Sequence, residues 1–191
     1  MTARRLFAFG SLAFAVAAIA WVLFVNLPRR YKPAKETAPP PAAAPAPVLG
    51  GRKIKARLFY VSDDGTRLKG VEREVTYGEG AAAQAQEIVK AQLRPVAEPL
   101  VSAVPTGTTL RAVYLTINGS AFVDLSREVV TGHSGGSLDE LLTIYCIVNA
   151  LTMNLPAVTS VQVLVDGKEV DTLAGHVDLR RPLAKNIAWV E

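Results

Sequence analysis

The sequence predicts an α+β fold, in which a mainly antiparallel sheet built from hairpins carries two packed helices and is preceded by one transmembrane helix. Three observations lead to this class. A long helical pattern of apolar residues lies in the last third of the chain. Three Asp-Gly or Asn-Gly dipeptides are each flanked by alternating apolar and polar residues, which is typical of β-hairpins. Finally, the N-terminal region contains an almost uninterrupted apolar stretch from Leu6 to Leu27.

The apolar helix is the element around which the rest of the domain is placed. Ser137 and Glu140 have the capping-box spacing, in which a Ser hydroxyl and a Glu carboxylate satisfy free backbone N–H groups at a helix start. We therefore expect a helix that begins near Leu138 and ends before Pro156, because the residue before a proline is pushed out of helical geometry. Apolar residues occupy nearly all of its faces, which predicts burial against a sheet and a second element. These residues are Leu141, Leu142, Ile144, Tyr145, Ile147, Val148, Leu151, Met153 and Leu155.

A hairpin is expected directly after this helix. Val161, Val163 and Val165 alternate with other residues up to Asp166-Gly167, a dipeptide suited to a type I′ turn because both of its residues need a positive φ. We expect strands over 158–165 and 169–173.

Two further hairpins and one helix precede the apolar helix. Strands are expected over 53–60 and 71–77 around Asp64-Gly65, and over 110–117 and 121–125 around Asn118-Gly119. An amphipathic helix is expected from Ala81 to Arg94, ending at Pro95. The order hairpin, helix, hairpin, helix, hairpin indicates an α+β domain with its helices on one face of the sheet.

The stretch from Leu6 to Leu27 is long enough to cross a bilayer as a helix, so residues 1–27 are expected to form a cytoplasmic tip and a membrane anchor. A cleaved signal peptide is the alternative, because Ala18-Ile19-Ala20 resembles a cleavage site. The length of the apolar stretch favours the anchor. Residues 28–52 form a linker rich in Pro and Ala, residues 53–185 the domain, and residues 186–191 a C-terminal tail.

The formal net charge of +4 is concentrated in the N-terminal region. The first fifty residues contain six Lys and Arg residues and one Glu, so the predicted domain is close to neutral. No basic helix, aromatic RNA-binding motif or zinc-finger spacing is present, and no nucleic-acid partner is expected.

Several segments, taken in order, resemble the GerMN domain, the sporulation and spore germination family. They are Thr106-Gly107-Thr108, Val123-Asp124-Leu125-Ser126 with Glu128, residues 145–152, residues 161–167, and Leu173-Ala174-Gly175-His176. The resemblance implies a domain held outside the cytoplasm by an anchor, with a fold similar to ring-building domains of secretion-type assemblies. It implies no catalytic residue.

Polar residues within the predicted core are interpreted as structural. Asn149 is expected to tie the helix to a neighbouring loop, and Thr152 to make a structural hydrogen bond. Cys146 is expected to be a small buried residue without a disulfide partner. The full set of expected core positions is Ser137, Glu140, Tyr145, Asn149, Thr152, Gln162, Asp166 and Gly167.

A hydrolase that uses Ser134 is a remote alternative. Residues 132–136 match G-x-S-x-G around Ser134, and Asp166 and His176 follow in the order of an α/β-hydrolase triad. The match is weak because residues 126–133 separate the serine from the preceding strand, and Asp166 is already needed in a turn. His133 is expected to be a solvated loop residue. Neither histidine has neighbouring metal ligands, so no metal and no cofactor are expected.

The sequence therefore predicts a non-catalytic binding or scaffolding protein of the cell envelope, single-pass in the cytoplasmic membrane through Leu6 to Leu27, with its domain outside the cytoplasm. Expected partners are envelope proteins or peptidoglycan, and the expected setting is sporulation, germination or an assembly at the cell wall. The main alternative is a homo-oligomer that builds a ring-type assembly through an exposed strand.

Overall fold

A computed structural model describes Trp21 and residues 51–191 of the chain. The expected membrane-spanning helix lies outside these residues, apart from Trp21, as does the linker up to Gly50. Among the helices within the described residues, none combines the length and the apolar content needed to cross a membrane.

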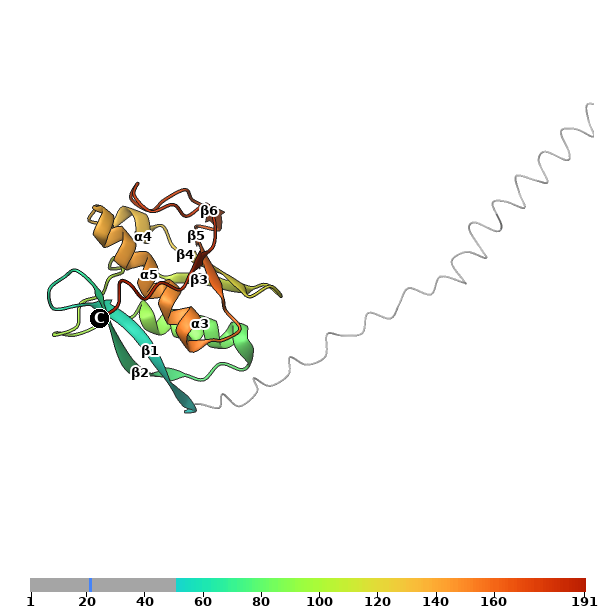
Figure 1. The fold of residues 1–191 in the computed structure, drawn as a ribbon. Coiled ribbons are helices and arrows are strands. Elements are labelled where there is room, and N and C mark those ends of the chain that lie inside the picture. The colour runs from blue at the N-terminus through green and yellow to red at the C-terminus, as the bar shows by residue number, and fades with distance from the viewer. Residues whose placement is uncertain (1–20, 22–50) are drawn as a thin grey trace, which may run out of the picture. The chain divides into compact units, whose positions relative to one another are not determined.

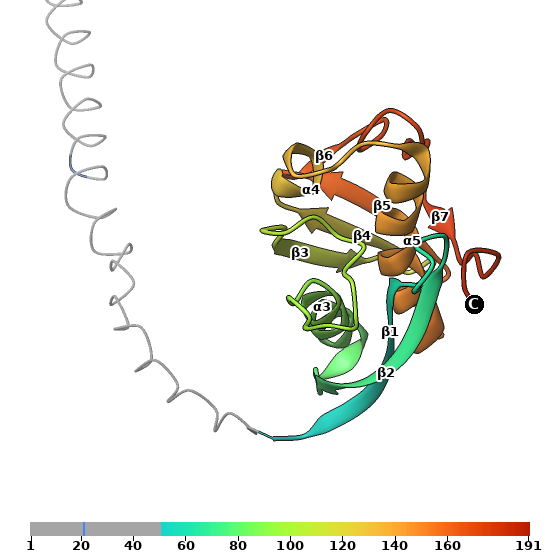
Figure 2. The ribbon, with the colours of Figure 1, turned by 90° about the vertical axis from the view of Figure 1, so that its left-hand side faces the viewer.

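The domain has the predicted α+β fold, with its two longer helices between two sheets (Figures 1 and 2). The smaller sheet is the antiparallel hairpin of β1 (Lys53–Val61) and β2 (Leu68–Thr76). The larger sheet has the order β3-β4-β5-β6, and β7 also pairs with β5. Its strands are β3 (Leu110–Leu115), β4 (Ser120–Leu125), β5 (Ser160–Val165), β6 (Lys168–Glu169) and β7 (Leu183–Ala184). The described helices are α3 (Gly80–Gln92), α4 (Glu128–Thr131) and α5 (Ser137–Asn154).

The larger sheet is not purely antiparallel, and the prediction of one sheet with helices on a single face is wrong. β4 and β5 are parallel, with Val123 opposite Val163. They cannot form a hairpin because α4 and α5 connect them, and such a crossover returns the chain in the same direction. The β1–β2 hairpin forms its own sheet on the far side of the helices.

The predicted turn at Asp166-Gly167 is confirmed, since these residues have φ values of 51° and 76°. The strand expected after it is wrong in length, because β6 ends at Glu169. Beyond this point the backbone N–H groups of Leu173 and His176 donate to the Glu140 carboxylate. The segment therefore loops back to α5 and does not extend the sheet.

The helix α5 lies in the core and contacts β1 on one side and β5 on the other, with α3 alongside (Figure 2). This arrangement explains the apolar residues on nearly all of its faces. The helix ends at Asn154, and Leu155 before Pro156 is extended, as predicted. Its buried side chains include Leu142, Ile144, Cys146, Ile147, Val148 and Leu151.

Two side-chain amides close the edge of β1 that faces away from β2. Asn154 accepts a hydrogen bond from the backbone N–H of Arg57 and donates to its carbonyl, both at 2.8 Å. Gln92 makes the same pair of bonds with Phe59, at 2.9 and 2.6 Å. Each amide replaces a neighbouring strand, so the outward backbone groups of Arg57 and Phe59 are satisfied by α5 and α3.

Candidate functional site

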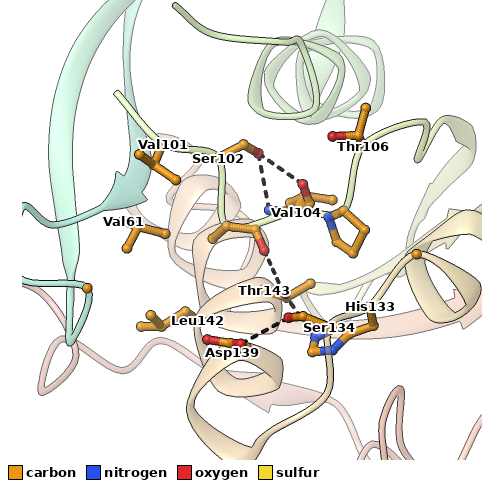
Figure 3. A pocket seen from close by; sticks show the side chains of 14 residues that line it. Val61, Val101, Ser102, Val104, Thr106, His133, Ser134, Asp139, Leu142 and Thr143 are labelled. Atoms are coloured by element: carbon orange, nitrogen blue, oxygen red, sulfur yellow. Dashed lines mark hydrogen bonds between the residues drawn. The ribbon is translucent and has the colours of Figure 1, made fainter. Parts of the chain in front are cut away.

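A cleft of about 440 Å³ lies between residues 101–106, the loop that precedes α5, and the first turns of α5 (Figure 3). This volume falls within the range of small-ligand sites. Its lining is mixed, because apolar side chains such as Val61 and Val101 lie beside polar ones, namely Ser102, Thr106, His133, Ser134, Asp139 and Thr143.

The wall formed by residues 101–106 is fixed at two points. The backbone N–H of Val61 donates to the carbonyl of Val101 at 2.9 Å, so the segment begins as a short antiparallel continuation of the small sheet. The buried Thr143 hydroxyl donates to the carbonyl of Ala103 at 2.5 Å. The segment is therefore held by β1 at one end and by α5 in its middle.

The opposite wall is a glycine-rich loop. At Gly132 an added Cβ would lie 2.9 Å from the Glu128 carbonyl oxygen and 3.2 Å from a Pro105 carbon, so a larger residue would push the two walls apart. Gly135 and Gly136 have φ values of 85° and 90°, which glycine adopts without strain. These glycines turn the chain sharply into α5.

His133 connects this loop to the helix, and its expected role as a solvated residue is wrong. Its Nδ1 atom accepts a hydrogen bond from the backbone N–H of Gly135 at 3.0 Å. Since that nitrogen is an acceptor, a neutral ring carries its proton on Nε2, which lies 3.4 Å from the Thr143 hydroxyl. The half-buried imidazole therefore holds the loop in place.

Ser134 and Asp139 form the exposed polar part of the cleft. The Ser134 hydroxyl donates to Oδ2 of Asp139 at 3.0 Å, and Val101 and Thr106 lie across the cleft from them (Figure 3). Among the described residues that line the cleft, Asp139 is the only Asp or Glu, and none is Lys or Arg. Asp139 also lies in the first turn of α5, where the helix dipole favours negative charge.

Glu140, the next residue, faces the protein interior. Its carboxylate is completely buried and accepts hydrogen bonds from the backbone N–H groups of Leu173 and His176, both at 2.8 Å. Burial alone would raise the pKa of Glu140, but the backbone N–H groups around it outweigh burial and hold the pKa below its usual value. The N–H groups are those of Ala174, His176, Leu173 and Val177.

The predicted capping box is therefore wrong. The residue that precedes the helix is Gly136, Ser137 is already helical, and no side chain caps the N-terminus. The Gly135-Gly136 turn sets the helix start one residue earlier than the capping-box spacing requires. Glu140 is consequently free to bind the loop at 173–177.

Two of the remaining predicted core residues, Asn149 and Gln162, join α5 and β5 to the C-terminal segments. Asn149 donates to the carbonyl of Asn186 at 2.8 Å and accepts from its N–H at 3.0 Å. Gln162 is buried and donates to the carbonyl of Leu179. Thr152 donates to the Val148 carbonyl within α5, and Tyr145 is half-buried against the core.

Cys146 is fully buried, and this burial raises the pKa of its thiol.

The Asp166-Gly167 turn is held from two sides. Arg111 and Arg127 each lie 3.4 Å from a carboxylate oxygen of Asp166, and the Gly167 N–H donates to Asp124 at 2.7 Å.

The three residues of the hydrolase hypothesis are engaged separately. Ser134 donates to Asp139, Asp166 pairs with two arginines, and the backbone of His176 donates to Glu140. Within the described part of the chain, no hydrogen bond joins any two of the three.

The sequence pattern did not single out Asp139, Thr143 or the wall at 101–106 as parts of a site. The glycines at 132, 135 and 136, directly before the helix start, were the available signal for the loop beside Asp139. The contribution of residues 101–106 had no comparable signal, because it depends on contacts with β1 and α5.

Comparisons with known proteins agree with this fold. The family described as "Germane: Sporulation and spore germination" matches residues 57–171. No curated protein matches the chain.

Three solved structures are similar at low sequence identity. The first GerMN domain of the sporulation protein GerM from Bacillus subtilis is 16% identical, with a TM-score of 0.53, over 70% of this chain and 98% of that one. The tandem GerMN domains of the same protein are 15% identical, with a TM-score of 0.54, over 70% of this chain and 46% of that one. A protein described as a lipoprotein, from Clostridium perfringens, is 22% identical, with a TM-score of 0.50, over 71% of this chain and 89% of that one.

The matched family covers more than half of the chain and most of the domain described above, including the second half of β1, all of α5 and the turn at Asp166-Gly167. The chain therefore belongs to the Germane family of sporulation and spore germination proteins.

Proposed function

We propose that this protein is a non-catalytic binding component of the cell envelope, and that the cleft between residues 101–106 and the start of α5 holds its partner. The observation that carries this proposal is the construction of the cleft. Hydrogen bonds from Val61 and Thr143 fix one wall, and His133 fixes the other. A preformed recess of this volume lies in the size range of ligand sites, and its lining offers both apolar contact and hydrogen-bonding groups.

The hydrogen bonding of Ser134 supports a non-catalytic role. A serine nucleophile needs a base within hydrogen-bond reach, normally a histidine oriented by a third group. Here the Ser134 hydroxyl donates to the exposed Asp139 carboxylate, while the neighbouring imidazole of His133 is engaged by Gly135 and Thr143.

The proposed location, outside the cytoplasmic membrane, rests on the apolar stretch from Leu6 to Leu27 and on the relatives. One similar structure is described as a lipoprotein and two come from a sporulation protein. Partners of the envelope, either proteins or peptidoglycan, follow from that location. Alkaline phosphatase fused to the C-terminus tests it, because the enzyme is active only after export and an inactive fusion would contradict the location.

Site-specific photo-crosslinking in the native host tests the binding function. A photoreactive phenylalanine analogue is placed at Val101, an exposed residue of the cleft, or at the fully exposed Ile117 in the turn between β3 and β4 as a control. The proposal predicts adducts with an envelope protein or a wall peptide, identified by mass spectrometry, at Val101 and not at Ile117. Equal labelling at the two positions would contradict it.

The outer edge of β2 supports a second candidate, a self-assembling component of an envelope complex. Leu68 at its start is paired with the C-terminal residues, since its N–H donates to the carbonyl of Trp189 and its carbonyl accepts from the N–H of Glu191. Beyond Leu68, no described strand pairs with this edge, and Glu72, Arg73 and Glu74 are exposed. Such an edge can pair with a second copy.

Light scattering of the purified protein over a wide concentration range separates the two candidates. A mass that rises to multiples of the monomer, and that falls again when Gly70 is replaced by proline, would favour self-assembly through β2. A constant monomer mass would favour a binding component that works through the cleft.

A further inference from the structure

The polar groups of the cleft are arranged for a ligand with one positive charge. Asp139 is the only carboxylate among the described lining residues, and no lysine or arginine of the lining neutralises it. One of its oxygens, Oδ2, accepts from Ser134, which leaves the carboxylate further lone pairs for a second donor. An anionic ligand would meet an uncompensated carboxylate at this position.

The apolar side of the cleft adds a second requirement. Val61 and Val101 line it with accessible side-chain surface, so they offer contact to an aliphatic chain. No Phe, Tyr or Trp is present among the described lining residues, so the flat aromatic surface on which a sugar ring or a base could stack is missing. A flexible methylene chain that ends in a charge matches both features.

We infer that the cleft binds a peptide that carries a primary ammonium group on an aliphatic side chain, with the Asp139 carboxylate as its counter-ion and Ser134 as the residue that orients this carboxylate. The inference rests on the proposed binding function and names the chemistry of the ligand. Two sources in an envelope supply this chemistry, a lysine of a partner protein and the free amine of a diamino acid in a wall peptide.

A titration with two small probes tests the inference. The full-length, ¹⁵N-labelled protein in detergent micelles is titrated with N-acetyl-lysine methylamide and, separately, with N-acetyl-norleucine methylamide, which has the aliphatic chain without the ammonium group. Backbone amide shifts at Ala103 and Asp139 report occupation of the cleft. We expect the lysine probe to bind about fivefold more tightly, the range expected for a partly exposed ion pair, and this advantage to shrink at high salt.

Two matched variants locate the charge. Asp139→Asn keeps the size of the side chain and should reduce the affinity for the lysine probe to that for the norleucine probe. Glu169→Gln removes an exposed carboxylate on β6, far from the lining residues in the sequence, and should leave both affinities unchanged. Equal affinity of wild type for both probes, failure of both probes to shift the cleft amides, or an unchanged lysine preference in Asp139→Asn would each overturn the inference.

Two larger ligands distinguish the sources. A lysine-containing tripeptide with blocked ends and a purified wall stem peptide with a free side-chain amine are titrated in parallel. Tighter binding of the tripeptide indicates a protein partner, and tighter binding of the stem peptide indicates the wall. The crosslinking experiment at Val101 does not depend on the source of the amine. If Val101 forms adducts with envelope components while the probes show no preference for an ammonium group, the binding function stands and the inference is rejected.

Discussion

Asp139 and Glu140 are adjacent carboxylates in the first turn of α5, yet they lie in opposite environments. A helix turns by about 100° per residue, so neighbouring side chains leave the axis in different directions. Glu140 is fully buried and surrounded by the backbone N–H groups of Leu173, Ala174, His176 and Val177. Asp139 is exposed in the cleft, where one serine hydroxyl donates to it. The difference shows that the set of donors around a carboxylate, more than its place in a helix, decides whether it holds the fold or remains available to a ligand.

Replacement of Glu140 should have the largest effect on stability. In Glu140→Ala the backbone N–H groups of Leu173 and His176 would lose their acceptor in a buried place, and hydrogen bonds to a charged group contribute about 1.5 to 3 kcal/mol each. We expect the free energy of unfolding to fall by about 4 kcal/mol, measured by urea denaturation. A loss below about 1 kcal/mol would show that the loop does not depend on this carboxylate.

The pH dependence of stability should report the same contact. The pKa of Glu140 is lowered in the folded protein, so its contribution is complete above the unfolded-state pKa of about 4.3 and is lost as the pH falls through the folded-state value. The free energy of unfolding should therefore fall less steeply below pH 5 in Glu140→Gln than in wild type. Parallel pH profiles for the two proteins would contradict this assignment.

The wall of the cleft should respond to Thr143. Thr143→Val keeps the shape of the side chain but removes the hydroxyl that donates to the Ala103 carbonyl, which should cost about 1 to 2 kcal/mol. Amide hydrogen exchange should then accelerate in residues 101–106 more than in β5. Thr143→Ser retains the hydroxyl and serves as the control, which should exchange like wild type.

The smallest effect on stability is expected at the exposed carboxylate. Asp139→Asn and Ser134→Ala should change the free energy of unfolding by no more than about 0.5 kcal/mol, because both side chains are exposed. In ligand binding the two variants should differ. Ser134→Ala should retain the preference for an ammonium group, whereas Asp139→Asn should lose it, as measured by the probe titration.

The parts of the fold that depend on local sequence could be predicted. The Asp166-Gly167 turn requires positive φ at both residues, and the stop of α5 follows from Pro156. The parallel pairing of β4 with β5 and the amides of Asn154 and Gln92 on β1 could not be predicted, because they join residues far apart in the chain.

The candidate site shows the same division. The glycines around Ser134 predict a loop at this position. The sequence does not distinguish the roles of Asp139 and Glu140, because both are acidic residues near the start of the same helix. The spacing of Ser137 and Glu140 favoured a capping box. The backbone N–H groups of Leu173 and His176 are instead the partners of Glu140, and no local sequence pattern predicts this contact.

One titration tests most directly whether Asp139 and Glu140 have different roles. N-acetyl-lysine methylamide is titrated into wild type and into Asp139→Asn, after urea denaturation has shown that the two proteins have the same free energy of unfolding. Our account predicts that Asp139→Asn folds as wild type does and binds this probe about fivefold more weakly, at the level of the norleucine probe. An unchanged affinity in Asp139→Asn would show that the exposed carboxylate does not recognise a ligand, and would contradict the account.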